Sequence, residues 1–357
     1  MKAWRLEGLG GALRLLDIPK PEPKPGGVVV RVEASTLMSY LKAYVEGRLP
    51  AYRAPDGAFT PGGNGVGTVE AVGSGVWSLK PGQRVVLSSL FTSAEPTPNP
   101  AQFLIGITAF DEASRRAQAE WPDGTLAEYA CLPASSVTPI DPALDHVPAT
   151  QLATASRFAI PYGGLVRGRL AAGETLIVTG ATGAYGSAAV LLAVAMGAGR
   201  VVAAGRNRER LERLATVAGS AVVAVPLTGE RDADAARLRQ AADGGAEMAF
   251  DMVGGARDPN ATLAALGALR RNGRLVLMGS MSVDLPLPYM QLMLNGLEII
   301  GNFMHGPSAY ATVLALVKAG RLDLAAIAPR TYPLASLPEA MDTAASAGNL
   351  EAVVIAP

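Results

Sequence analysis

The feature that most constrains this chain is a turn of small residues between an apolar run, 175–179, and a predicted helix over 184–198. The turn reads Gly180-Ala181-Thr182-Gly183-Ala184-Tyr185-Gly186. Small residues let the chain turn sharply, bring bare backbone close to a diphosphate and pack the helix near the sheet. Free N–H groups at the helix N-terminus attract phosphate oxygens. Because a second predicted strand, 200–204, follows, the context favours a dinucleotide-binding turn over an ordinary strand-to-helix turn.

The rest of this region alternates apolar runs with helical segments. Strands are predicted at 175–179, 200–204, 221–225, 248–251, 274–278 and 297–300. Continuous apolar strands separated by amphipathic helices indicate a parallel sheet covered on both faces. Six strands complete a dinucleotide-binding sheet. We therefore predict an α/β fold in which residues 154–303 form a Rossmann doubly wound parallel sheet.

The first 150 residues or so show a different sequence pattern, in which short strands are separated by turns. Strands are predicted at 28–34, 66–72, 84–87 and 128–132, and a last strand at 352–355. This spacing predicts a compact β-rich domain. The segment 93–124 interrupts it with prolines and a short predicted helix, 111–120. A connection of this length is either functional or a tolerated surface insertion.

Composition excludes several classes of protein. Lys plus Arg and Asp plus Glu both total 31, so no excess charge suggests a nucleic-acid or anionic-membrane partner. Cys131 is the only cysteine, which rules out an intrachain disulfide and favours a reducing compartment. The longest apolar stretch, about 188–199, is too short to span a bilayer. We expect a cytoplasmic protein that acts on a small molecule.

The end of the second predicted strand indicates which cofactor binds. An NAD enzyme places Asp or Glu near this point to hold the ribose 2′-hydroxyl, and a carboxylate there would repel a 2′-phosphate. Here Gly205 leaves room and Arg206 supplies positive charge, with Asn207 and Arg210 close behind. These residues favour NADPH/NADP+. The alternative is that the arginines only solvate the following helix.

Several further segments have an order and spacing that are typical of one protein family. They are 61–67, 72–76, 79–85, 124–129, 250–255 and 274–279. Together with the glycine turn they resemble the medium-chain dehydrogenase/reductase superfamily, in particular its zinc-free quinone oxidoreductase-like branch, over nearly the whole chain. The resemblance implies a GroES-like catalytic domain built from 1–153 and 304–357, a Rossmann NADP-binding domain between them, and an active site in the cleft. Further cofactor contacts are expected from Val253, Gly279, Ser280 and Phe303.

The resemblance also indicates where zinc ligands would stand. Zinc alcohol dehydrogenases of this superfamily bind their catalytic metal with two cysteines and a histidine. The first cysteine position carries Met38, the Gly-His-Glu position reads Gly62-Gly63-Asn64, and the second cysteine position falls near Leu152. We therefore expect no metal. A different metal site made from Cys131, His146 and His305 would not have a spacing typical of metal ligands.

Without zinc a simple carbonyl has no Lewis acid to polarise it. Conjugated acceptors spread the developing charge over an enolate, which one or two hydrogen bonds stabilise. The first expectation is therefore NADPH-dependent reduction of a quinone or an α,β-unsaturated carbonyl. The alternatives are a zinc-independent alcohol dehydrogenase or carbonyl or imine reductase, and a non-catalytic NADPH-binding protein.

Candidate pocket residues are mostly apolar and predict a nonpolar substrate with one polar group. They are Met38, Tyr40, Tyr44, Asn64, Met281 and His305. Tyr40 stands two residues after the first lost cysteine, where the zinc enzymes carry the hydroxyl that starts a proton relay. It is either a catalytic proton donor or an aromatic wall. The outer strand, 297–303, is apolar and predicts a homodimer joined edge to edge.

Overall fold

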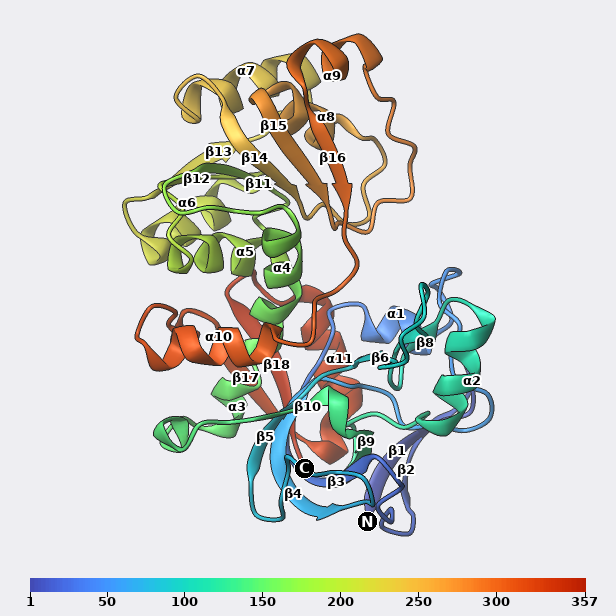
Figure 1. Cartoon of the computed structure of the whole chain (residues 1–357). Coiled ribbons are helices and arrows are strands. Elements are labelled where there is room, and N and C mark those ends of the chain that lie inside the picture. The colour runs from blue at the N-terminus through green and yellow to red at the C-terminus, as the bar shows by residue number, and fades with distance from the viewer. The chain divides into compact units, whose positions relative to one another are not determined.

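The computed structural model describes residues 1–357, which divide into two compact units. The first unit comprises Met1–Ser156, Ile327–Ala347 and Glu351–Pro357, and the second comprises Arg157–Ala326 and Gly348–Leu350. Figure 1 shows the chain coloured from blue at the N-terminus to red at the C-terminus. Residues 304–326, expected in the catalytic domain, lie in the second unit. Within this second unit the Arg321 guanidinium donates a hydrogen bond to the carbonyl of Ala195 at 3.4 Å.

The first unit is built on a seven-stranded sheet in the order β10-β5-β4-β3-β18-β17, with β9 paired to β3. Its strands are β3 (Gly27–Thr36), β4 (Gly65–Val72), β5 (Arg84–Leu87), β9 (Tyr129–Pro133), β10 (Val137–Pro139), β17 (Ala328–Pro333) and β18 (Glu351–Ala356). The C-terminal strand β18 runs antiparallel to β3, with Val354 opposite Thr36. Strands from the N-terminal part and from the C-terminal part of the chain therefore pair in one sheet, as the GroES-like fold requires.

Smaller elements complete this unit. They are β1 (Lys2–Leu6), β2 (Leu13–Asp17), α1 (Leu41–Val45), β6 (Leu90–Thr92), β7 (Gln102–Leu104), β8 (Thr108–Ala109), α2 (Glu112–Glu120), α3 (Ala149–Leu152), α11 (Leu337–Ser346) and the 3-10 turns η1 (Ala134–Ser136), η2 (Pro142–Leu144) and η4 (Leu334–Ser336). The remaining 3-10 turn, η3 (Leu324–Ala326), lies in the second unit.

The segment 93–124 is integrated into the first unit. It contributes β7, β8 and the predicted helix, found as α2. Asp111 caps this helix by accepting from the Ser114 amide at 2.8 Å, and the Ser114 hydroxyl accepts from the Gln102 amide at 3.0 Å. Phe103 and Ile105 are fully buried in the core under the sheet. The segment is therefore part of the domain and not a loose surface insertion.

The second unit contains a six-stranded parallel sheet in the order β13-β12-β11-β14-β15-β16. Its strands are β11 (Thr175–Thr179), β12 (Arg200–Gly205), β13 (Val222–Pro226), β14 (Ala246–Asp251), β15 (Leu269–Leu277) and β16 (Glu298–Gly301). Its helices are α4 (Ala155–Arg167, starting in the first unit), α5 (Ala184–Ala195), α6 (Arg208–Ala218), α7 (Arg231–Ala241), α8 (Asn260–Gly267), α9 (Tyr289–Asn295) and α10 (Ala309–Lys318). The six strands predicted from the sequence, and the fold class, are confirmed.

The strand order reverses between β11 and β14, from which the sheet grows in opposite directions. Ligands of open α/β sheets bind in the crevice at the carboxyl ends of the strands beside such a switch point. Here those ends are Thr179 and Asp251, which are paired in register. On one face of the sheet Ile177, Val202 and Leu275 are fully buried against the leucines of α7 and α8. Each such side chain contributes roughly 1.5–3 kcal/mol.

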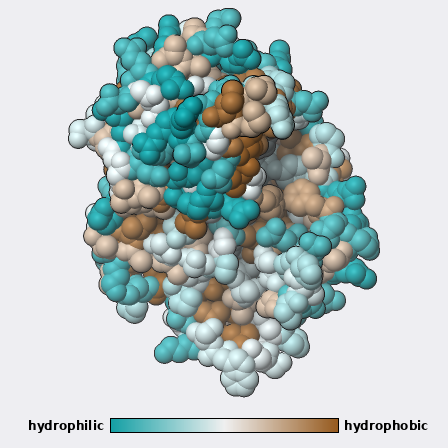
Figure 2. All heavy atoms as spheres, turned by 45° about the horizontal axis from the view of Figure 1, so that its top comes forward, coloured by the Kyte–Doolittle hydropathy of each residue, from teal (hydrophilic) through white to brown (hydrophobic).

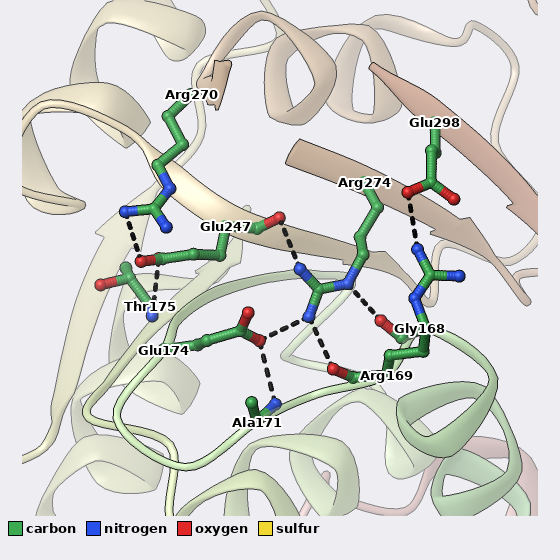
Figure 3. A network of polar contacts seen from close by, with 9 residues as sticks. All are labelled: Gly168, Arg169, Ala171, Glu174, Thr175, Glu247, Arg270, Arg274 and Glu298. Carbon is green, nitrogen blue, oxygen red and sulfur yellow. Dashed lines mark hydrogen bonds and ion pairs between the residues drawn. The ribbon is translucent and has the colours of Figure 1, made fainter. Parts of the chain in front are cut away.

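A polar network stabilises the opposite, N-terminal edge of this sheet (Figure 3). The buried guanidinium of Arg274 donates to Glu174 at 2.5 Å, to the carbonyl of Arg169 at 2.8 Å and to the carbonyl of Gly168. It also reaches the carbonyl of Glu247 at 3.3 Å. The network therefore holds the connection between α4 and β11 against strands β14 and β15.

None of the helices has the length and apolar character needed to cross a bilayer.

Candidate cofactor site and catalytic residues

The turn between β11 and α5 brings three backbone segments close together. Gly180 has φ +68°, and a Cβ there would lie 2.6 Å from the carbonyl of Met252. A Cβ on Gly186 would lie 2.1 Å from the carbonyl of Gly180. Gly183 caps α5 without a side-chain hydrogen bond. The glycines are therefore required by close contact, and the helix N-terminus presents N–H groups that no side chain caps, which suits an anionic ligand.

The end of β12 lies against the same turn. A Cβ on Gly205 would meet the side chain of Thr182 at 2.8 Å, and the Ala181 amide donates to the carbonyl of Ala204 at 3.0 Å. The predicted residues Gly180–Gly186 and Gly205 thus form one continuous surface. No carboxylate occupies the end of this strand, which closes with Ala204 and Gly205.

Basic side chains follow that surface at the start of α6. Asn207 caps the helix, with its Oδ1 accepting from the Arg210 amide at 3.0 Å. Arg208 pairs with Glu212 at 3.7 Å, whereas Arg206 and Arg210 form no ion pair. Arg206 is exposed, so its guanidinium is available for an anionic group of a ligand.

The ends of β14 and β15 complete the cofactor side. A Cβ on Gly279 would lie 2.2 Å from the carbonyl of Val253, and one on Gly254 would lie 3.0 Å from the hydroxyl of Ser280. Val253, Gly279 and Ser280 therefore lie together beside the switch point.

Asp251 at the end of β14 is a residue whose role the sequence reasoning missed. Its buried carboxylate accepts from the Thr179 hydroxyl at 2.6 Å and from the Val253 amide at 3.3 Å. Burial raises the pKa of Asp251, and these two hydrogen bonds lower it in part. The carboxyl group joins the end of β11 to the turn after β14. No sequence signal separates it from an ordinary strand-end aspartate.

The remaining predicted residues of this unit follow β16 or β15. Phe303 and Met281 are at least partly exposed. The His305 ring packs edge-to-face on Tyr310 at 5.4 Å, and burial lowers its pKa. A Cβ on Gly163 of α4 would lie 2.1 Å from the carbonyl of Met304, so α4 packs directly on this turn.

In the first unit, two of the predicted pocket residues are buried: Asn64, directly before β4, and Met38, shortly after β3. The Asn64 Oδ1 accepts from the Ser89 amide at 2.9 Å, which fixes the orientation of the side-chain amide. A Cβ on the preceding Gly63 would lie 2.5 Å from that of Ser89, so a larger residue at position 63 would displace the segment between β5 and β6.

The two tyrosines of the predicted pocket differ in exposure, although both rings pack on that of Tyr52. Tyr40 precedes α1 and is partly exposed, with its ring 5.8 Å from that of Tyr52. Tyr44 is fully buried and donates its hydroxyl to the carbonyl of Ile107 at 2.5 Å, and burial raises its pKa. The expectation that Tyr44 lines the pocket is wrong, because its side chain belongs to the core.

Comparison with known proteins identifies the family. The Alcohol dehydrogenase GroES-like domain matches residues 24–142, and the Zinc-binding dehydrogenase family matches residues 184–319. An alcohol dehydrogenase from Geobacillus stearothermophilus is 31% identical over 304 residues, 85% of this chain and 85% of that protein. The chain belongs to the zinc-binding alcohol dehydrogenase family of the medium-chain dehydrogenase/reductase superfamily. It is an NAD(P)-dependent oxidoreductase.

Other relatives support this family placement. An alcohol dehydrogenase from Moraxella sp. is 29% identical over 304 residues, again 85% of both chains. The structure of a cobalt- and zinc-bound thermostable alcohol dehydrogenase from Pyrobaculum aerophilum is similar with a TM-score of 0.78 and 25% identity, over 100% of this chain and 99% of that one. An acryloyl-coenzyme A reductase from Metallosphaera sedula is 29% identical over 223 residues, 62% of this chain and 64% of that protein. The superfamily is confirmed, but the expected quinone oxidoreductase-like branch is corrected to the alcohol dehydrogenase family.

The zinc of this alcohol dehydrogenase family is not matched by the side chains of this chain. No three histidine, cysteine or acidic side chains come together as a possible metal site. Met38 and Leu152 are buried apolar residues, and the nearby Ser156 hydroxyl bonds to the Ala153 carbonyl at 2.9 Å and the Thr36 hydroxyl at 3.1 Å. A catalytic zinc needs three ligands such as thiolate, imidazole or carboxylate. The donor set at this position does not fit zinc.

Proposed function

We propose that this chain is a zinc-independent, NADP(H)-dependent oxidoreductase that interconverts a small carbonyl compound and its alcohol. The single observation that carries the proposal is the identity of 31% to an alcohol dehydrogenase over 85% of both chains. The second support is the close packing of the glycine turn on the end of β12, the position at which sheets of this kind bind a dinucleotide. The absence of zinc ligands distinguishes the proposal from the usual chemistry of the family.

NADP(H) is proposed as the cofactor because of the charge at the end of β12. Arg206 and Arg210 form no ion pair, and the strand ends in Gly205 without a carboxylate. A 2′-phosphate placed there would meet an unpaired guanidinium, which binds phosphate with charge-assisted hydrogen bonds. An NAD-specific site would need an acceptor for the ribose 2′-hydroxyl at the same point.

The nicotinamide supplies or accepts the hydride when it is bound, and the protein has to manage the oxygen of the substrate. In this proposal the Tyr40 hydroxyl donates a hydrogen bond, and then a proton, to the oxygen that becomes negative. Contact with the Tyr52 ring limits the freedom of the Tyr40 side chain. Positioned acids of this kind contribute about 10²–10⁴ in rate.

A second candidate is the reduction of an activated alkene, such as a quinone or an α,β-unsaturated carbonyl. Two observations favour it: the unsuitable zinc ligands, and the 29% identity to an acryloyl-coenzyme A reductase. Conjugation delocalises the negative charge, so hydrogen bonds alone stabilise the enolate.

The test is a screen of NADPH oxidation with ketones, aldehydes, imines, enones and quinones, before and after dialysis against a strong chelator. We expect turnover of a ketone or aldehyde that survives chelation. Turnover restricted to enones or quinones would replace the first candidate by the second. Activity that is lost on chelation and restored by zinc would contradict zinc independence, and no turnover of any substrate would favour a non-catalytic NADPH-binding protein.

Tyr40→Phe keeps the ring and removes only the hydroxyl. If the hydroxyl acts in the transition state, kcat should fall by roughly two to four decades with little change in NADPH affinity. Tyr52→Phe is the matched control, because it alters the neighbouring tyrosine and should leave kcat within a few-fold. A fall of less than about threefold for Tyr40→Phe would make Tyr40 a wall of the pocket.

A further inference from the structure

The buried carboxyl group of Asp251 lies where two strands of the dinucleotide unit leave the sheet. The residue ends β14 and is 2% exposed. Its Oδ1 accepts hydrogen bonds from the Thr179 hydroxyl at 2.6 Å and from the Val253 amide at 3.3 Å. Burying a carboxyl group is unfavourable unless hydrogen bonds compensate for the lost hydration. Such a group at the end of a strand whose other residues are mostly apolar suggests a role beyond packing.

The backbone next to Asp251 is in close contact with the glycine turn after β11. The Met252 amide donates to the Thr179 carbonyl at 3.2 Å. A Cβ on Gly180 would lie 2.6 Å from the Met252 carbonyl oxygen and 3.0 Å from the Val253 nitrogen. No space separates the two turns, so a movement of one displaces the other. The hydrogen bond between Thr179 and Asp251 stands directly before this contact in both strands.

The turn after β15 packs on the same segment. The Met278 amide donates to the Asp251 carbonyl at 3.1 Å. A Cβ on Gly279 would lie 2.2 Å from the Val253 carbonyl oxygen and 2.9 Å from the Val253 nitrogen. Asp251 therefore contacts both neighbouring strand ends, one through its side chain and the other through its backbone. These strand ends form the carboxyl edge beside the switch point, where sheets of this kind bind ligands.

We propose that Asp251 is a positioning residue of the cofactor site: its carboxyl group holds the turn after β14 against the glycine turn, and this geometry sets the affinity for the dinucleotide. The inference rests on the proposed function in one respect, namely that a dinucleotide binds at these turns. Asp251 acts through Thr179 and Val253, because its own side chain is buried. The end of β12 is separated from β14 by β11, so a ligand that binds only beside Arg206 should not sense the change.

Two variants remove the hydrogen bond from opposite sides. Asp251→Leu replaces the carboxyl group by an apolar side chain, and Thr179→Val keeps the branched shape and removes only the hydroxyl. Dissociation constants for NADPH, NADH and 2′-AMP are measured by calorimetry. We expect each variant to weaken both dinucleotides by about tenfold, within the range for residues that act on a site through their neighbours, and to leave 2′-AMP unchanged. The double variant should weaken them by about tenfold and not a hundredfold, since both changes remove one bond.

A conservative variant and a control separate positioning from stability. Asp251→Asn keeps an oxygen that accepts from Thr179 and Val253, so it should restore the wild-type affinity for both dinucleotides. Arg274→Leu breaks a buried network at the opposite edge of the same sheet, so it should destabilise the unit and leave all three dissociation constants unchanged.

Unchanged dinucleotide affinity in Asp251→Leu and Thr179→Val would overturn the proposal, as would an equal loss for 2′-AMP. Thr179→Val decides alone if Asp251→Leu does not fold, because it changes the shape of the core least. A loss in Asp251→Asn as large as that in Asp251→Leu would also overturn it, since the carboxyl charge and not the hydrogen bond would then matter. If the unmodified protein binds neither NADPH nor NADH, the proposed function itself fails, which is a separate and recognisable result.

Discussion

We predict that cofactor preference depends on the charge of Arg206, the residue that follows β12. Arg206 is exposed and unpaired, so its removal leaves the fold intact. A hydrogen bond to a phosphate contributes roughly 1.5–3 kcal/mol, so Arg206→Ala should weaken NADPH about tenfold to a hundredfold and leave NADH nearly unchanged. Titration of both cofactors measures the effect. Arg208→Ala is the matched control, because Arg208 already pairs with Glu212. Equal loss for both cofactors, or a wild-type preference for NADH, would contradict the NADP assignment.

Asp251 should make stability depend on pH in an unusual direction. Its folded pKa is raised by burial, so the fold favours the protonated carboxyl. The contribution of Asp251 to stability is therefore largest below the unfolded pKa of about 3.9 and falls as pH rises from there through the raised folded pKa. The Asp251→Asn variant has no titrating group at this point, and its side-chain oxygen can still accept from Thr179 and Val253.

Asp251→Asn should consequently unfold at a higher midpoint temperature than the wild type at neutral pH, with the difference closing toward about pH 4. Scanning calorimetry across that range measures both proteins. Asp232→Asn is the control, since Asp232 is exposed and its pKa is lowered by Arg231. A difference that grows as pH falls would show that Asp251 is stabilising as a carboxylate.

Single residues were predictable where contacts with the nearby backbone decide which side chain fits. Gly180 and Gly186 follow from the turn itself, because any Cβ would collide with nearby backbone. The burial of Tyr44 was not predictable, because Tyr40 stands just outside α1 with φ −99° and ψ 7° whereas Tyr44 lies inside the helix, although both rings pack on Tyr52. The burial of Asn349 was not predictable either, because the hydrogen bond that its backbone carbonyl accepts from the Ser187 hydroxyl joins positions 162 residues apart. Only tertiary structure brings such a pair together.

At the scale of elements, the connection from α4 to β11 depends on Arg274. Its side chain is 9% exposed and that of Glu174 is 20% exposed, so the pair is largely desolvated. Removing one partner of a buried pair leaves the other charge uncompensated and costs about 3–5 kcal/mol. Arg274→Leu should lower the free energy of unfolding by about that amount, measured by urea denaturation (Figure 3). Arg231→Ala, which removes an exposed pair with Asp232, should leave the free energy of unfolding nearly unchanged, because solvent screens that pair. A loss below about 1 kcal/mol for Arg274→Leu would mean that the network contributes little.

Elements were predicted best where hydrophobic periodicity is strong. The six parallel strands were found because each is a continuous apolar run between helices. The short strands β6, β7 and β8 were not predicted, since two or three residues carry no periodic signal. Their pairing is fixed by tertiary contacts, including the burial of Phe103.

At the scale of the whole molecule, both chain ends contribute to the first unit, and the family resemblance predicted this. Its boundary was less accurate: α10 and the residues up to Ala326 lie with the dinucleotide unit. Helix α10 has a buried face that includes Tyr310, Val313 and Leu314. An amphipathic pattern shows that a helix packs on something but not which domain supplies the contact.

The dinucleotide unit also exposes an apolar surface around its last strand. Strand β16 pairs only with β15, so one of its edges is unpaired. The neighbouring helix α9 exposes Tyr289, Met290 and Leu294 by 74%, 59% and 62%. Figure 2 shows hydrophobic residues gathered on the upper part of the view, among hydrophilic ones. An unpaired edge beside exposed apolar side chains is a template for association with a second copy.

We therefore predict a homodimer in which β16 and α9 of two chains meet. Leu294→Lys places a charge on the exposed face of α9, where burial in a dimer would be unfavourable without a partner. Light scattering at micromolar concentration should give a dimer for the wild type and a monomer, or a mixture shifted toward monomer, for Leu294→Lys. Trp77→Lys is the matched control, since Trp77 is 93% exposed in the other unit and should remain dimeric after the change. A wild type that is monodisperse as a monomer would refute the dimer. A Leu294→Lys variant that stays fully dimeric would show that α9 lies outside the interface.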